Sequence, residues 1–185
     1  MKEIRIHGRG GMGAVKAAEA LVYAAVMDDK YGNSIPFFGF ERQGAPVTAF
    51  VRISDEPIRP KNRIYHPDIL IVLDPTIMNA VNVFDGVRKG GMLILNTSHS
   101  AKEIKVPDNI EKIAVVNATQ VAMDTIGRPI TNTVMLGAFC AATGLVSVEE
   151  VAKKVEELWG AKNKEALYKG YEMAVVEEID WGGAK

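Results

Sequence analysis

The residues with the clearest chemical potential form a glycine-rich segment: Gly8, Arg9, Gly10, Gly11, Met12 and Gly13. They match the pattern G-x-G-x-x-G, which binds phosphate groups when it lies between a strand and a helix. Glycines permit positive φ angles and let backbone N–H groups approach an anion, and the N-terminus of the following helix favours negative charge. We therefore predict that this loop binds a phosphate or a carboxylate.

A complete dinucleotide site would also need an acidic residue at the end of the second strand, about 20 residues further on. Glu41 follows such a strand, but it lies beyond that spacing and Arg42 comes next. Asp28 and Asp29 are nearer, but they close a predicted helix. Two alternatives therefore stay open: the glycines form only a tight strand-to-helix turn, or the chain is an independent NAD(P)-dependent oxidoreductase.

A second loop places a carboxylate, a guanidinium and an amide next to a glycine: Glu41, Arg42, Gln43, Gly44, Ala45 and Pro46. A simple hairpin would use Asn-Gly or Asp-Gly, so this composition favours a loop that grips a ligand or contacts a partner surface. We predict that Arg42 makes a salt-bridged or phosphate contact and that Glu41 and Gln43 orient it. The alternative is a solvated loop with an internal Glu41–Arg42 pair.

Other polar residues at element ends have mainly structural explanations. Asp74 follows a buried strand and precedes Pro75, which suits a helix N-cap. Asn132 and Thr133 begin a later helix, and we interpret them as helix caps. The alternative is that they also face a ligand. His7 is interpreted as a structural residue, and no metal site is predicted.

Composition limits what the chain can do alone. Its 185 residues carry a net charge of −1, which argues against a nucleic-acid binder held by bulk electrostatics. One cysteine, Cys140, cannot form an internal disulfide or supply the ligands of an iron–sulfur cluster, and we interpret it as a small buried residue. The sequence shows neither a secretory signal nor an apolar stretch of about 18 residues, so we expect no membrane contact and a cytoplasmic location.

The hydrophobic pattern predicts strands and helices that position these loops. The expected strands cover residues 4–6, 35–40, 47–53, 69–73, 92–95 and 112–116, and the expected helices cover 12–28, 120–126, 133–143, a segment from 147, and 162–179. The segment between 40 and 47 is too short for a helical crossover, so these strands should be antiparallel or joined by a wide loop. The helix 133–143 is apolar on nearly every side, so it is buried in the domain or covered by another subunit. We predict a single domain, residues 1–185, with a Rossmann-like three-layer α/β/α sandwich and a mixed, mostly parallel sheet.

Three motifs together resemble the gamma subunit of the 2-oxoacid:ferredoxin oxidoreductases. They are the Gly8–Gly13 loop, the segment from Glu41 to Val47, and the segment from Asn132 to Ala138. The similarity covers essentially the whole chain, and the pyruvate enzyme is the nearest match. Many relatives carry Gln where this chain has Met12, which argues against a side-chain role at that position.

The resemblance implies a subunit of a heterotetramer that decarboxylates pyruvate oxidatively to acetyl-CoA and passes two electrons to ferredoxin. It implies that alpha, beta and delta subunits carry the thiamine diphosphate, Mg and iron–sulfur clusters, while the gamma chain binds none of them and is not catalytic by itself. It also implies coenzyme A or partner contacts at Glu41, Arg42, Gln43, Gly44, Pro46, Asn132 and Thr133. Alternatives are a gamma subunit for 2-oxoglutarate, 2-oxoisovalerate or indolepyruvate, and an assembly module whose glycine loop binds nothing.

Overall fold

A computed structural model describes residues 1–37 and 43–180. Within these ranges seven strands form one sheet in the order β2-β3-β1-β4-β5-β6-β7. The strands are β1 (Lys2–Arg9), β2 (Tyr31–Phe37), β3 (Pro46–Ser54), β4 (Ile69–Val72), β5 (Gly91–Asn96), β6 (Ile110–Val116) and β7 (Val175–Glu178). Strands β1, β4, β5 and β6 are parallel to one another. Strand β3 is antiparallel to both β1 and β2, and β7 is antiparallel to β6.

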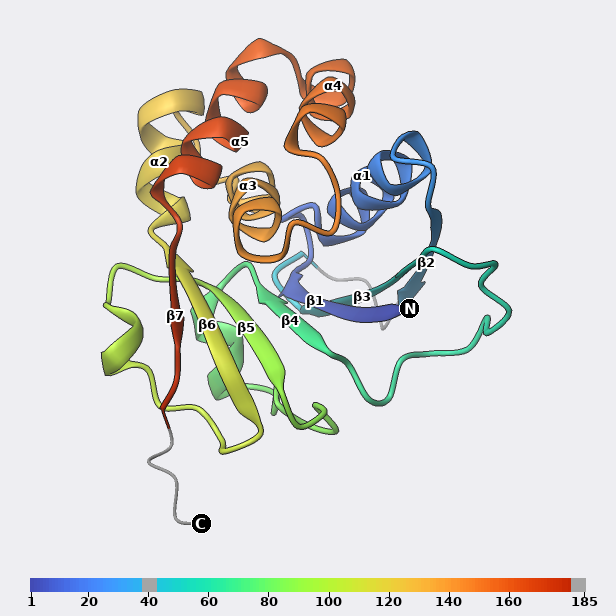
Figure 1. The fold of residues 1–185 in the computed structure, drawn as a ribbon. Helices are drawn as coiled ribbons and strands as arrows, with labels where there is room; N and C mark the ends of the chain where they lie inside the picture. The colour runs from blue at the N-terminus through green and yellow to red at the C-terminus, as the bar shows by residue number, and fades with distance from the viewer. Residues whose placement is uncertain (38–42, 181–185) are drawn as a thin grey trace.

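The five α-helices of the described ranges cover one face of this sheet (Figure 1). They are α1 (Ala14–Met27), α2 (Ala118–Ile126), α3 (Asn132–Thr143), α4 (Val148–Trp159) and α5 (Ala161–Met173). The opposite face is covered by two short 3-10 helices, η1 (Pro75–Asn79) and η2 (Ala101–Glu103), and by the loops around them. The predicted α/β class and the mixed sheet are confirmed, and the layer on the far face consists of η1, η2 and loops.

The handedness of the crossovers explains why the two faces differ. The connection from β1 to β2 passes through α1 and moves toward one edge of the sheet, whereas the connections β4–β5 and β5–β6 move toward the other edge. Connections between parallel strands are right-handed, so crossovers that move in opposite directions lie on opposite faces. Helix α1 therefore joins the helical face, and η1 and η2 cover the other.

Strand β1 is buried on both faces, with apolar side chains on one face and charged side chains on the other. Ile4 and Ile6 belong to the apolar core under the helices. On the other face Glu3 is buried and accepts hydrogen bonds from Arg52 at 2.8 Å and Arg88 at 2.7 Å. Arg5 is also buried and donates to the carbonyl oxygens of residues 83 and 85. Each of these buried charges therefore has hydrogen-bond partners, which offset the cost of removing it from water.

Helix α3 lies within the chain's own core. Ten of its residues are buried, and it packs mainly against α5, with further contacts to α1, α2, α4 and the sheet. Of the two explanations for its apolar surface, burial in the domain is therefore the one that the structure supports.

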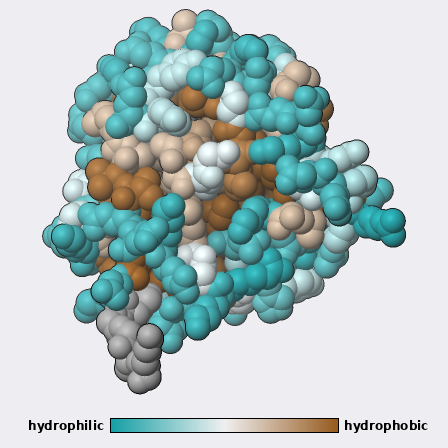
Figure 2. All heavy atoms as spheres, in the orientation of Figure 1, coloured by the Kyte–Doolittle hydropathy of each residue, from teal (hydrophilic) through white to brown (hydrophobic). Residues whose placement is uncertain are grey.

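The C-terminal region corrects one prediction. The expected helix over 162–179 ends at Met173, and β7 begins at Val175. The valines at 175 and 176 pair with Val115 and Ala114 of β6, and β-branched residues favour extended backbone. Figure 2 shows apolar surface over β7, in keeping with the exposure of Met173, Val175 and Val176.

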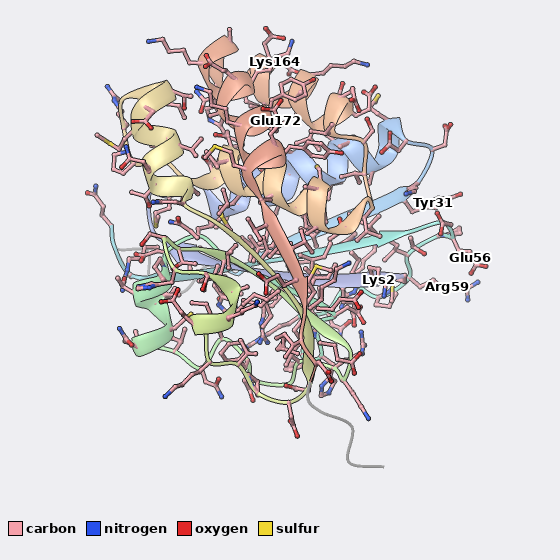
Figure 3. All side chains as sticks on the ribbon, turned by 60° about the vertical axis from the view of Figure 1, so that its left-hand side comes forward. Lys2, Tyr31, Glu56, Arg59, Lys164 and Glu172 are labelled. Atoms are coloured by element: carbon pink, nitrogen blue, oxygen red, sulfur yellow. The ribbon has the colours of Figure 1, made fainter. Side chains whose placement is uncertain are left out.

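The predicted antiparallel pairing of the second and third strands is confirmed, with Ile35 opposite Phe50. Strand β2 begins at Tyr31, earlier than expected, and residues 38–40 lie outside the described residues. Figure 3 shows Lys2, Tyr31, Glu56 and Arg59 at one end of the sheet, where β1 and β2 begin. In the described part of the chain, no helix is both long enough and apolar enough to cross a lipid bilayer.

Candidate functional site

The glycine loop lies where the sheet topology changes direction. It follows the carboxyl end of β1, and the neighbouring β4 ends beside it, since Leu73 donates its backbone N–H to the His7 carbonyl oxygen at 2.9 Å. From β1 the chain continues toward the β2 edge, and from β4 it continues toward β6. In open α/β sheets, ligands bind at the carboxyl ends of the strands at such a switch point. The position of the loop therefore suits a binding site.

The loop leads directly into α1 through backbone conformations that glycine adopts more easily than other residues. Gly11 has φ of 90° and Gly13 has φ of 78°. Gly13 is the N-cap of α1, and no side chain caps it among the described residues. The first N–H groups of a helix lack intrahelical acceptors and carry partial positive charge. Within the described residues, the N–H groups at the start of α1 therefore have no acceptor, as an anion site requires.

Arg9, a residue of the predicted anion-binding loop, is fixed by hydrogen bonds within the chain. Its guanidinium donates to Asp74 Oδ2 at 2.8 Å, to Thr76 Oγ1 at 2.9 Å and to the Gly44 carbonyl oxygen at 3.0 Å. Asp74 also caps η1 by accepting from the Thr76 backbone, as predicted. Burial opposes ionisation of Asp74, but hydrogen bonds from Thr76 and Arg9 outweigh it and lower the pKa of this carboxyl group. Arg9 therefore joins β1, β4 and the second loop.

The second predicted loop lies directly against the glycine loop. Gly10 donates its N–H to the Ala45 carbonyl oxygen at 2.8 Å, and Gly44 donates to the Gly10 carbonyl oxygen at 3.1 Å. Gln43 lies beside Gly11, and Gln43, Gly44 and Pro46 are exposed. The structure thus brings these loops together. Glu41 and Arg42 lie outside the described residues, so their contacts stay predictions.

The Asn132 side chain lies over the end of the glycine loop. Only 3% of Asn132 is exposed, and its Oδ1 accepts from the Thr133 backbone N–H at 2.9 Å. A Cβ atom on Gly13 would lie 2.5 Å from Asn132 Nδ2, so the amide occupies the space that glycine leaves. Among the described residues Nδ2 has no hydrogen-bond acceptor. Thr133 is fully buried, does not line the cleft described next, and its hydroxyl lacks a partner in the described residues.

A cleft of about 670 Å³ opens in front of Gly13 and Asn132. One wall is the glycine loop with α1, including Met12 and Lys16, and the other comes from the α2–α3 connection and the α4–α5 junction. The basic lining residues are Lys16, Arg128 and Lys162, and the described lining contains no carboxylate. Lys16 pairs on the surface with Glu19 at 2.7 Å. The cleft is thus a positively charged pocket with backbone and amide donors, which suits a phosphorylated ligand.

Sequence reasoning missed the second wall. Arg128, Trp159 and Lys162 are far from the glycine motif in sequence, and tertiary packing brings them to it. Their only sequence signal is that each lies within two residues of a glycine that ends or begins a helix, Gly127 or Gly160.

Two other predicted structural residues behave as expected. Burial raises the pKa of the Cys140 thiol to about 12, so it is not a reactive thiolate. Burial, and then the positive charge of Arg5, lower the pKa of His7 to about 3, so its imidazole is neutral. Arg5 Nε donates to His7 Nε2 at 3.1 Å, which places the imidazole proton on Nδ1.

Comparisons with known proteins agree on one family. Residues 3–173 match the family model described as pyruvate ferredoxin/flavodoxin oxidoreductase. The chain is 47% identical to the pyruvate/ketoisovalerate oxidoreductases common subunit gamma of Thermococcus litoralis, covering 97% of this chain and 100% of that one. It is 43% identical to the gamma subunit of the NADH-dependent phenylglyoxylate dehydrogenase of Aromatoleum evansii, covering 97% of each.

Among solved structures, the chain is similar to the pyruvate oxidoreductase subunit PORC of Thermotoga maritima. The TM-score is 0.84 at 38% sequence identity, and the match covers 96% of this chain and 98% of the other. The fold described above is therefore shared with a subunit of such an enzyme.

Proposed function

This chain belongs to the pyruvate ferredoxin/flavodoxin oxidoreductase family, as a gamma-type subunit of a 2-oxoacid oxidoreductase complex, and on that premise we propose that its enzyme is a pyruvate:ferredoxin oxidoreductase. In this proposal the complex converts pyruvate and coenzyme A to acetyl-CoA and carbon dioxide and transfers electrons to ferredoxin. Alpha, beta and delta subunits are the partners of this chain in the cytoplasm. The PORC structure of Thermotoga maritima, named for a pyruvate oxidoreductase, supports the choice of substrate.

The chain's part in this reaction is to bind and assemble. The described cleft is lined by cations, amides and apolar groups, with no His, Cys, Asp or Glu that could act as acid, base or nucleophile. A single cysteine cannot hold an iron–sulfur cluster. We therefore assign thiamine diphosphate, Mg and the clusters to the other subunits.

The glycine loop is proposed to receive a phosphate group of coenzyme A. The observation that supports this most directly is the position of Asn132. Its Nδ2 lies over Gly13 at the N-terminus of α1 and has no acceptor among residues 1–37 and 43–180. A phosphate oxygen there would accept from this amide and from the free backbone N–H groups. Negative charge would also be favoured by the α1 dipole.

The identity of the 2-oxoacid is proposed to depend on another subunit. One relative is named as a gamma subunit common to pyruvate and ketoisovalerate oxidoreductases, and another serves a phenylglyoxylate dehydrogenase. These acids differ in side chain, yet the gamma chains resemble this one to a similar degree. A gamma-chain site for a substrate that all these enzymes share fits that pattern better than a site for the side chain of the 2-oxoacid.

The substitution Asn132→Asp tests the coenzyme A contact in the assembled enzyme. Aspartate keeps the oxygen that accepts from Thr133 but replaces the donor by a negative charge, so the KM for coenzyme A should rise by about tenfold or more. The KM for pyruvate should not change. Gln120→Glu, on the exposed surface of α2, is the control. An unchanged KM for coenzyme A would contradict the proposal, and weakened subunit association alone would favour the assembly module.

The rival class, an independent NAD(P)-dependent oxidoreductase, has its own test. Titration of the purified chain with NADH, followed by fluorescence, should show no binding at micromolar concentration. Tight binding by the chain alone would favour the rival.

A further inference from the structure

Strand β7 forms the outer edge of the sheet on the side of β6 (Figure 1). Ile179, just after β7, donates its backbone N–H to the Glu111 carbonyl oxygen at 2.9 Å. Successive residues of a strand direct their backbone groups to opposite sides, so those of Val176 and Glu178 point away from β6. Among the described residues, these outward N–H and C=O groups have no partner. The sheet therefore ends in backbone groups with which another strand can pair.

The valines at this edge are exposed on both faces of the sheet. Val175 is paired with Val115, which belongs to the core on the face of η1 and η2, and Val176 is paired with Ala114 under the helices. Val175 nevertheless has 52% of its surface exposed and Val176 has 36%. Met173, at the end of α5, is exposed as well. Side chains with β-branches pack well against those of a neighbouring strand, and no described strand supplies that neighbour on the outer side of β7.

A groove of about 690 Å³ lies beside this edge, between β7 and the segment that contains η2. Its apolar lining comes from both sides of the groove: Ala101, Ile104, Val106, Ile113 and Ile179. Residues of an added strand alternate between the two faces of a sheet, so every second side chain would lie on the face of this groove. Pockets for alternate side chains give specificity where a strand joins a sheet edge. The groove therefore favours a segment with apolar residues at alternate positions.

The charge of β7 indicates which strand fits. The strand ends in two adjacent carboxylates, Glu177 and Glu178. Lys112 is in register with Glu178, and Lys102 and Lys105 line the groove, but none of them forms an ion pair with these glutamates in the described part of the chain. Opposite charges on facing strands stabilise a sheet, and like charges destabilise it. The edge therefore favours a strand that carries Lys or Arg opposite the glutamates.

A second copy of this chain fits the edge less well. Its own β7 would bring the same carboxylates to the pairing, and a symmetric antiparallel pair centred on Glu177 would place two of them directly opposite each other. The other edge strand, β2, contains no Lys or Arg, and its Pro36 has no N–H to donate. Short length and charge are also features that keep edge strands from pairing with copies of themselves. The strand that fits is thus one from a different chain.

We propose that β7 binds an extended segment of another subunit of the same oxidoreductase complex, which adds a further strand to this sheet. The segment has apolar residues at alternate positions and Lys or Arg opposite Glu177 and Glu178. This inference rests on the proposed function, in which the chain assembles with alpha, beta and delta subunits. It places one contact between subunits away from the cleft at the glycine loop, whose described lining contains no residue of β7.

The substitution Val176→Pro tests the backbone contact in the complex with the alpha, beta and delta subunits. Proline removes an N–H that faces away from β6, so the chain keeps its own ladder but loses the pairing with an added strand. The dissociation constant of this chain from the other subunits should rise by about tenfold or more. Val176→Thr keeps the N–H and the β-branched shape, so this matched control should change the constant by no more than about threefold. Equal effects of the two variants, or no effect of Val176→Pro, would overturn the proposal.

The substitution Glu178→Gln tests the charge of the partner strand. Loss of one exposed carboxylate should weaken association by about two- to fivefold at low salt, and by less at high salt. Glu56→Gln is the control, because Glu56 is exposed near the start of β1 and β2, at the other side of the sheet (Figure 3). Unchanged or stronger association in Glu178→Gln would contradict the choice of a basic strand.

Hydrogen exchange tests the added ladder in the unaltered protein, and it remains decisive if Val176→Pro fails to fold. The amides of Val176 and Glu178 should exchange about tenfold or more slowly in the complex than in the full chain alone, because the added strand gives them acceptors. The Ile179 amide, which already donates to Glu111, is the internal reference. Equal exchange in the two states would overturn the proposal.

Two further outcomes separate this inference from the proposed function. If the full chain alone sediments as a dimer in which the amides of Val176 and Glu178 are protected, the occupant is a second copy and the inference fails. If the chain forms no complex with alpha, beta and delta subunits, both the proposed assembly and the inference fail. A complex that forms without protection of these amides overturns the inference alone.

Discussion

Gly137 of α3 and Gly170 of α5 each lie against the backbone of the other helix. A Cβ atom on Gly137 would collide with the Leu167 carbonyl oxygen, and one on Gly170 would collide with the Val134 carbonyl oxygen. The two helices thus approach as closely as backbone allows. Because α5 also carries one wall of the cleft, this contact sets how far that wall lies from the glycine loop.

Substitution of either glycine by alanine should destabilise the protein. In an exposed helix Gly→Ala usually stabilises by about 0.5–1 kcal/mol, but here the added methyl group meets backbone that must move. We expect a loss of about 1–3 kcal/mol for each variant, measured by urea unfolding. Lys169→Ala, on the surface of α5, should change stability by no more than about 0.5 kcal/mol. Unchanged or increased stability in Gly170→Ala would show that the helices can separate without cost.

The two positions with φ of 78°, Gly13 and Gly127, form a matched pair. A Cβ atom on Gly127 would meet no atom of the described residues within 4 Å, whereas one on Gly13 would meet Asn132. Gly127→Ala should therefore cost only the backbone strain, about 1–2 kcal/mol, and Gly13→Ala should cost more. Comparison of the two unfolding free energies measures the cost of displacing Asn132. Equal values would mean that the amide moves freely.

His7 makes stability depend on pH below neutrality. Its pKa is lowered from 6.5 to about 3 in the folded protein, so the unfolded chain binds a proton that the folded chain excludes. The stabilisation is therefore complete above pH 6.5 and decreases by about 1.4 kcal/mol per pH unit as the pH falls below it. Urea unfolding at pH 7.5, 6.5 and 5.5 should show the decrease. The variant His7→Gln should reduce the decrease in unfolding free energy per pH unit. An identical decrease in both proteins would contradict this role of His7.

Arg9 should control the ionisation of Asp74. Its hydrogen bond and charge help to lower the pKa of this carboxyl group, together with the bonds from Thr76. Arg9→Ala should raise that pKa toward its ordinary value, measured by carboxyl-carbon NMR, and reduce stability at pH 7 by no more than about 1 kcal/mol, since the pair is partly exposed. The stabilisation by ionised Asp74 decreases as the pH falls through its lowered pKa. Arg59→Ala is a control distant from the pair in sequence, and a pKa unaffected by Arg9→Ala would refute the link.

Local patterns predicted the first part of the site well. The alternation in β1, the glycines and the helical spacing of α1 are all encoded within about 28 consecutive residues, so the strand–loop–helix unit could be found before any packing was known. The meeting of the two loops and the position of Asn132 over Gly13 could not, because they depend on contacts between residues distant in sequence. The predicted roles of Glu41 and Arg42 stay predictions.

The end of α5 shows how tertiary pairing overrides a local pattern. Val175 and Val176 continue the apolar spacing of the helix, and the sequence alone offers no strong stop signal before them. Their partners on β6 decide the matter by supplying backbone hydrogen bonds. Likewise, Arg128 and Lys162 look like ordinary surface charges until folding brings them to one cleft.

The position of β7 also has a consequence for folding. This strand pairs with β6, yet the whole of α2, α3, α4 and α5 separates them along the chain. Such distant pairing is slow to form, because a long loop must close before any contact is gained. During synthesis, β6 would therefore emerge with an open edge and remain a temporary risk for self-association until the residues around Val175 arrive to cover it.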